Sequence, residues 1–175
     1  MNYIYPMAVH GKPFRILLWI FFVACMLVLA KFILFKKSPH YYLDYFRYHY
    51  HSGIIRQGWK NANLRPFHTI RSFYNSRRLN AGYKMINLGG NIIGFIPLGI
   101  LLPLLFGPLD RPGRLLGTVF LISLGFESIQ LLFGLGAFDV DDMILNSLGG
   151  LTGYLFYRAA LLILHYAIRS DGRLI

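Results

Sequence analysis

Charged residues and cysteines are both scarce in this chain of 175 residues. Only 14% of the residues are charged and 55% are hydrophobic, whereas a typical soluble domain carries roughly 25% charged residues. This composition argues against a soluble monomer, and also against a disordered chain, which would be poor in apolar residues. The single cysteine, Cys25, lies in an apolar run and excludes an internal disulfide. The sequence therefore predicts a membrane protein.

Acidic residues are also few, because seven Asp and Glu stand against 18 Lys and Arg, for a net charge of +11. In a soluble protein this excess would suggest nucleic-acid binding. Here the basic residues flank apolar runs, so we expect membrane lipids, anionic headgroups or lipid-linked phosphates as partners, and no nucleic acid. Four of the acidic residues fall within one short stretch: Glu127, Asp139, Asp141 and Asp142. The composition leaves the oligomeric state open.

Four apolar segments are long enough to cross a bilayer, which takes about 20 mostly apolar residues. They cover approximately residues 16–35, 86–106, 115–133 and 143–164. The first could be a signal peptide, but its apolar run exceeds the usual length of about 7–15 residues and no cleavage site follows, so we interpret it as an anchor. We expect an all-α integral membrane protein with four transmembrane helices and an interfacial amphipathic segment between the first two.

Three regions follow from these spans. Residues 1–59 comprise the N-terminal anchor and an aromatic interfacial segment, residues 60–165 form the main domain with the other three spans, and residues 166–175 form a C-terminal tail. With four spans, both termini and the 107–114 loop lie on one side of the membrane, opposite the 36–84 segment. That side has six Lys and Arg and the opposite side has ten, spread through a long loop, so charge does not decide the orientation.

The segment between the first two spans is rich in aromatic and basic residues. Residues 41–50 are dense in Tyr and Phe, as expected for chain at headgroup depth. Further on, apolar residues recur at steps of three and four with arginines between them: Leu64, Arg65, Phe67, Ile70, Arg71, Tyr74, Arg77 and Arg78. Two interpretations stay open. One is a basic amphipathic segment on the membrane, interrupted at its start by Pro66, and the other is a solvated irregular loop.

Each of the last three spans carries one stripe of polar or small residues. The stripes are Asn87, Asn91 and Gly94; Ser123, Glu127 and Gln130; and Asp142, Asn146, Gly149 and Gly153. Steps of three and four place each stripe on one helix face. At the rise of an α-helix, Asn91, Glu127 and Asn146 all lie roughly 6–10 Å below the same surface. We therefore expect a polar pocket under one face of the membrane.

Glu127 is the only glutamate of the chain and falls inside an apolar span. A charge at that depth costs about 2.5–3.5 kcal/mol, so such residues face the bundle interior and are functional candidates. We take Glu127 as the candidate acid or base, and predict a ligand site from Asn91, Glu127, Gln130, Asp142 and Asn146. The alternative is a hydrogen-bonded clasp that only holds the helices together.

Three aspartates and the paired glycines allow both functional and structural interpretations. Asp139, Asp141 and Asp142 could hold a divalent cation, but a helix cap by Asp141 or Asp142 is favoured, and no cofactor is expected. The small-residue pairs Gly90–Gly94 and Gly149–Gly153 predict close helix packing.

Four sequence blocks closely resemble the VanZ-like family: NLRPFHTI at 63–70, NLGGNIIGFIPLG at 87–99, SLGFESIQ at 123–130 and FDVDDMILNSLGG at 138–150. The resemblance covers about residues 60–157. It implies a multi-pass protein of the bacterial cytoplasmic membrane. The founding member of the family gives low-level resistance to the glycopeptide teicoplanin, and no established reaction comes with the family.

Two classes of function remain open. In the first, a non-enzymatic protein binds an amphiphile or a lipid-linked cell-envelope intermediate, with Arg65, Phe67 and Arg71 as ligand residues of the interfacial segment and the arginines at the phosphate. In the second, a membrane enzyme modifies a lipid headgroup with Glu127 as acid or base, or the pocket serves lipid transport or scrambling. The chain lacks common hydrolase motifs, which favours the first class. Because glycopeptides act outside the cell, we place the 36–84 segment outside.

Overall fold

The computed structural model describes residues 11–75 and 81–170, except the side chains of residues 81, 83–86 and 168–170. Four long helices dominate it: α1 (Lys12–Ile33), α5 (Ala81–Leu105), α6 (Pro112–Phe133) and α7 (Val140–Ser170). Between α1 and α5 lie α2 (Pro39–Asp44), the π-helical turn η2 (Tyr45–His49), α3 (Ile54–Asn61) and α4 (His68–Asn75), and the 3-10 turn η3 (Gly107–Leu109) joins α5 to α6. The described residues form no β-strand, which confirms the predicted all-α class.

All four predicted spans are confirmed as helices long and apolar enough to cross a membrane: Lys12–Ile33, Asn87–Leu105, Pro112–Phe133 and Val140–Ala167. Three of them begin earlier than expected. In the first and third, a proline occupies the first helical turn, where its missing N–H costs no hydrogen bond. The last span is also longer than expected, because α7 continues to Ser170 and has 31 residues.

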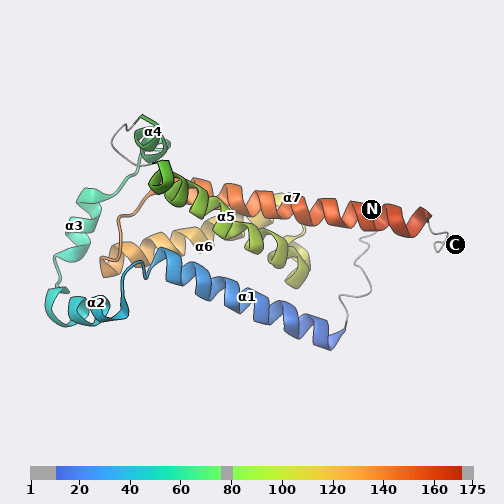
Figure 1. Ribbon diagram of the computed structural model, residues 1–175, viewed down its shortest axis with the longest axis horizontal. Helices are drawn as coiled ribbons and strands as arrows, with labels where there is room; N and C mark the ends of the chain where they lie inside the picture. The colour runs from blue at the N-terminus through green and yellow to red at the C-terminus, as the bar shows by residue number, and fades with distance from the viewer. Residues whose placement is uncertain (1–10, 76–80, 171–175) are drawn as a thin grey trace.

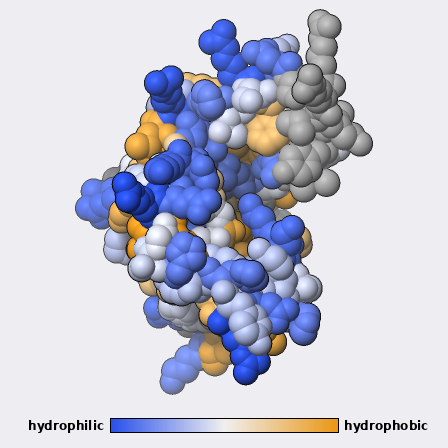
Figure 2. All heavy atoms as spheres, turned by 90° about the vertical axis from the view of Figure 1, so that its left-hand side faces the viewer, coloured by the Kyte–Doolittle hydropathy of each residue, from blue (hydrophilic) through white to orange (hydrophobic). Residues whose placement is uncertain are grey.

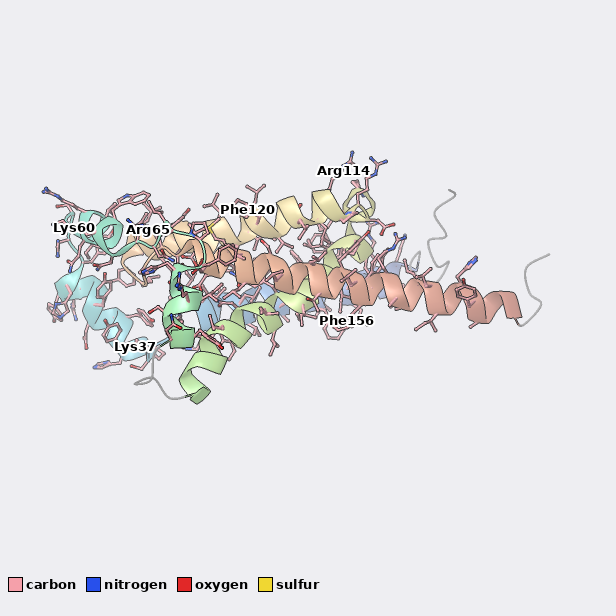
Figure 3. All side chains as sticks on the ribbon, turned by 90° about the horizontal axis from the view of Figure 1, so that it is seen from above. Lys37, Lys60, Arg65, Arg114, Phe120 and Phe156 are labelled. Atoms are coloured by element: carbon pink, nitrogen blue, oxygen red, sulfur yellow. The ribbon has the colours of Figure 1, made fainter. Side chains whose placement is uncertain are left out.

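The long helices lie side by side along the longest axis of the molecule (Figure 1). Helices α2, α3 and α4 gather at the end where α1 stops and α7 begins, which we call the polar end. The start of α1, the turn η3 and the end of α7 lie at the opposite end, as the four-span arrangement requires. Along the middle of the bundle, Phe120 and Phe156 are exposed on its flanks, where lipid would surround them (Figure 3).

Helices α5 and α7 touch through glycine. A Cβ atom added at Gly153 would lie 2.0 Å from the Ile96 carbonyl oxygen, and one at Gly149 would lie 2.1 Å from that of Ile92. The predicted packing role of this pair is therefore confirmed. The expectation for the other pair is wrong at Gly90, which faces open space within the described residues, whereas Gly94 meets Leu29 of α1.

The interfacial segment is helical in three places. Helix α4 begins after Pro66, because a proline disfavours helical geometry at the residue before it. The segment is therefore helical over His68–Asn75, and its position on the membrane stays a prediction. Arg77 and Arg78 lie outside the described residues. The sequence did not predict α3, which packs on the end of α6 through Gly58 and Leu131.

The opposite end is closed by an ion pair. Arg158 of α7 lies 3.3 Å from the buried carboxylate of Asp110, and the Tyr154 hydroxyl donates to the Asp110 carbonyl at 3.1 Å. These contacts tie the turn between α5 and α6 to α7. Between this ion pair and the polar end, the hydrophobic core is built around Phe95, Leu115 and Val119.

Candidate functional site

The polar end is held together by a short parallel bridge between Asn63 and Asp139. The Asn63 amide donates to the Phe138 carbonyl at 2.8 Å, and the Val140 amide donates to the Asn63 carbonyl at 3.0 Å. The bridge fixes the chain just before α4 against the first turn of α7. It therefore brings the interfacial segment to the acidic stretch.

Asp139 is the residue that caps α7. One carboxylate oxygen accepts from the Asp141 amide at 2.8 Å and from the Asn63 side chain at 2.8 Å, and the other accepts from the Thr69 hydroxyl at 2.6 Å. The prediction that Asp141 or Asp142 provides this cap is wrong, because the helix starts at Val140 and both residues lie within its first turn.

Asp141 instead holds the start of α4. Its side chain is fully buried and accepts hydrogen bonds from the Phe67 amide and, at 3.1 Å, from the Ile70 amide. The Phe67 amide directly precedes α4 and the Ile70 amide lies in its first turn, where helix donors lack partners of their own. Phe67 has a left-handed backbone with φ of 63°, and the residue is 62% exposed. Asp141 thus fixes the position of this exposed residue.

Glu127 links α6 to the loop that precedes α7. It is 1% exposed, and its Oε2 atom accepts from the Asp139 amide at 2.8 Å. The carboxylate also interacts electrostatically with Asp139, Asp142 and Lys36. Its depth in the bundle agrees with the expectation that this glutamate faces the interior.

The other predicted ligand residues form hydrogen bonds between helices. Asn91 of α5 donates to Asp142 of α7 at 2.6 Å, and Asn146 of α7 donates to Ser123 of α6 at 2.8 Å. The side chain of Gln130 donates to the Ile33 carbonyl at the end of α1, at 3.0 Å. At this end of the bundle each of these side chains forms a hydrogen bond to a neighbouring helix. The interhelical hydrogen bonds that the structural alternative predicts are therefore present, and ligand binding by the same residues stays a prediction.

The predicted arginines lie at the surface of the polar end. Arg65 and Arg71 are exposed, as is His68, and their side chains contact no acidic partner among residues 11–75 and 81–170. Arg65, Lys37 and Lys60 all lie at this end, far from Arg114 (Figure 3). Hydrophilic residues cover most of the face that the polar end presents (Figure 2).

Aromatic side chains bind the interfacial helices to the end of α6. The Tyr45 hydroxyl donates to the Phe133 carbonyl at 3.1 Å. Burial, together with the neighbouring Tyr41 and Tyr50, raises the pKa of the Tyr45 hydroxyl above its ordinary value, so this group stays protonated and keeps its role as donor. The contact places the aromatic stretch against the bundle.

The acidic stretch does not resemble a metal centre. Within the described part of the chain, no group of three His, Cys, Asp or Glu side chains is arranged to hold a metal ion. Two of the three aspartates are occupied by backbone and side-chain donors of the bridge region. The divalent-cation hypothesis therefore receives no support from these residues.

Sequence reasoning missed two residues of this region, Asn63 and Thr69. Both donate to Asp139, which lies 76 and 70 positions away along the chain. The signal available in the sequence was their presence in the block at 63–70. That block identified the chain segment that contains both residues, but it did not identify Asp139 as their hydrogen-bond partner.

Comparison with known proteins gives two matches. The family model described as VanZ/LLP1 matches residues 15–164 of the chain. Protein VanZ of Enterococcus faecium is 32% identical over 135 residues, which cover 77% of this chain and 70% of that protein. No solved structure matches the chain.

Proposed function

The chain belongs to the VanZ/LLP1 family, and on this premise we propose that it lowers the susceptibility of bacteria to lipoglycopeptides such as teicoplanin. It does so from the bacterial cytoplasmic membrane, without catalysing a reaction. The polar end binds an amphiphile or a lipid-linked cell-envelope intermediate. Teicoplanin differs from vancomycin in carrying a lipid tail, so a protein that acts at the membrane should give resistance to teicoplanin and not to vancomycin.

The observation that carries this proposal is that exposed basic side chains and buried acidic and polar side chains occur at the same end of the bundle. Exposed basic side chains, among them Arg65 and Arg71, surround the polar end, while the carboxylate of Glu127 lies buried below them. A guanidinium group binds phosphate through two parallel hydrogen bonds. The buried polar residues then contact the part of the ligand that lies deeper.

The arginine contribution is tested by expressing the protein in a susceptible Gram-positive host and measuring the inhibitory concentration of teicoplanin. We expect Arg65→Gln combined with Arg71→Gln to remove most of the resistance, because the phosphate loses its bidentate donors. The matched control is Arg114→Gln, which removes the same charge at the opposite end and should leave resistance unchanged.

Membrane levels of all variants are compared by immunoblot. If the double arginine variant confers the same resistance as Arg114→Gln at equal membrane levels, the proposed role of the interfacial segment is wrong.

A further inference from the structure

Three oxygen atoms between α6 and α7 have no hydrogen-bond donor among the described residues. The Oδ1 atom of Asn146 is buried without a partner, on a side chain that is 2% exposed. Glu127 accepts through Oε2 and Asp142 through Oδ1, which leaves the second oxygen of each carboxylate without a described donor. The Glu127 side chain is buried, and Asp142 is half-buried. A buried polar atom without a partner, such as the Asn146 oxygen, is costly and is usually satisfied by water or a ligand.

The geometry places these oxygens on facing turns of two helices. Ser123 and Glu127 are one turn apart on α6, and Asp142 and Asn146 are one turn apart on α7. The hydrogen bond of 2.8 Å between Ser123 and Asn146 sets the two helices in register. One turn nearer the polar end, Glu127 and Asp142 interact electrostatically. The unpartnered Asn146 oxygen therefore lies one helix turn from the two carboxylates, on the facing sides of α6 and α7.

The hydrogen-bonding capacity of this group favours a ligand that donates. The side-chain amides of Asn91, Gln130 and Asn146 already donate to Asp142, to Ile33 and to Ser123. Each amide uses one of its two N–H groups in these contacts, whereas the second oxygen of Glu127, that of Asp142 and the Oδ1 atom of Asn146 remain as acceptors. Because two of these three acceptors are carboxylates, they repel the phosphate or carboxylate of a ligand, and we place that group at the exposed arginines.

Charge favours a cation. Neither Glu127 nor Asp142 forms an ion pair with a described Lys, Arg or His side chain, and Asp139 adds further negative charge nearby. Lys36 is the described cation that interacts with both carboxylates, and its side chain is exposed. Carboxylates kept within an apolar bundle without a close counter-charge are unfavourable. A bound cation would compensate them.

We propose that Glu127, Asp142 and Asn146 bind a primary ammonium group, presented by the headgroup of an amine-bearing lipid. An ammonium group has three N–H donors, which matches the three acceptor oxygens. The inference rests on the proposed function and narrows it, because Arg65 and Arg71 would hold the phosphate of the same headgroup.

The test uses the purified full chain in detergent, with lipid retention measured by native mass spectrometry. Dioleoyl-phosphatidylethanolamine is compared with dioleoyl-phosphatidylcholine, since the two have the same charge and chains but only the first has N–H donors. We expect the ethanolamine lipid to bind about tenfold more tightly, because the trimethylated ammonium group of the choline lipid cannot donate hydrogen bonds to the carboxylates.

Glu127→Gln should remove this preference, because it keeps the shape of the side chain and its acceptor for the Asp139 amide but loses the charge. Asn146→Leu should remove it as well, and Arg114→Gln, at the opposite end, should keep it. Thermal unfolding of each variant shows whether it is folded. If Asn146→Leu does not fold, the lipid preference of the near-isosteric Glu127→Gln variant decides whether the ammonium site exists.

Dioleoyl-phosphatidylglycerol, which is anionic and lacks an amine, separates this inference from the proposed function. If the wild type binds the glycerol lipid through its arginines but binds the ethanolamine and choline lipids equally, the ammonium site is refuted and the proposed function stands. If the wild type retains none of the three lipids, the ammonium site is refuted, and the resistance of the double arginine variant decides the proposed function.

Discussion

At the scale of single residues, Asp141 fixes the start of α4 at the polar end. Its two carboxylate oxygens accept from two amides at the start of α4, and it has no exposure to solvent. A carboxylate in this position satisfies helix donors that would otherwise be buried without partners. The exposed Phe67 and the arginines on either side of it are placed through this contact.

We predict that Asp141→Asn destabilises the protein by about 1–3 kcal/mol, because an amide has a single acceptor oxygen and leaves one donor of α4 unsatisfied. Thermal unfolding in detergent measures the loss, and hydrogen exchange should speed up selectively in α4. Asp142→Asn is the matched control, since Asp142 contacts neither amide of α4. Equal exchange in the two variants would contradict the role given to Asp141.

Part of this site can be predicted from the sequence. An ionisable residue within an apolar span, such as Glu127, faces the bundle interior because lipid contact would be too costly. The stripes containing Asn91 and Asn146 follow from helical spacing in the same way. The partners do not follow, because Asn63 and Asp139 meet through a backbone bridge across 76 positions, and local patterns carry no information on such a contact.

At the scale of helices, α5 and α7 approach each other closely through glycine. Gly149 and Gly153 face the backbone of α5, and Gly99 of α5 faces that of α7. Small residues let helices approach in a bilayer, where lipid removes the hydrophobic drive for association. This contact holds Asn91 beside Asp142, so the packing of these two helices determines part of the polar end.

We expect Gly153→Ala to destabilise the bundle by about 1–3 kcal/mol, since the added methyl group would overlap the Ile96 carbonyl and push the helices apart. Gly125→Ala on α6 is the control, because a Cβ there meets nothing within 4 Å. Unfolding of both variants in the same detergent gives the comparison. A Gly153→Ala protein as stable as the control would show that the two backbones are not in contact.

The helices themselves were predictable to different degrees. The four spans follow from long apolar runs, which leave no other way to satisfy the backbone within a membrane. The ends of the spans do not follow from the apolar runs alone, since prolines at 13 and 112 suit the first turn of a helix and extend two spans beyond the apolar residues. Helix α3 is short and polar on one face, and it depends on contact with α6, which the local pattern does not contain.

At the scale of the whole molecule, charged side chains lie at both ends, the aromatic stretch at 41–50 lies at the polar end, and the middle is mostly apolar. Lys60 and Arg114 mark the two ends (Figure 3). One span, Asn87–Leu105, separates these two residues along the chain, so they lie on opposite sides of the membrane when all four helices cross it. The orientation stays a prediction, and we expect Lys60 outside.

Topology is tested by cysteine labelling in intact cells, which the scarcity of cysteine makes simple. In a Cys25→Ser background, Lys60→Cys should react with an impermeant maleimide from outside, and Arg114→Cys should react only after permeabilisation. The reverse pattern would move the polar end to the cytoplasm and away from the site of glycopeptide action.

The central claim is that the buried carboxylate of Glu127 acts in function and does not serve as a clasp alone. It is tested most directly by the inhibitory concentrations of teicoplanin and vancomycin for cells expressing the wild type or Glu127→Gln at matched membrane levels. Glutamine keeps the hydrogen bond from the Asp139 amide, so the fold is retained. We predict that the wild type raises the teicoplanin value by a few doubling dilutions, leaves vancomycin unchanged, and loses the effect in the variant. Equal teicoplanin values for the two proteins would contradict the claim and leave Glu127 as a structural clasp.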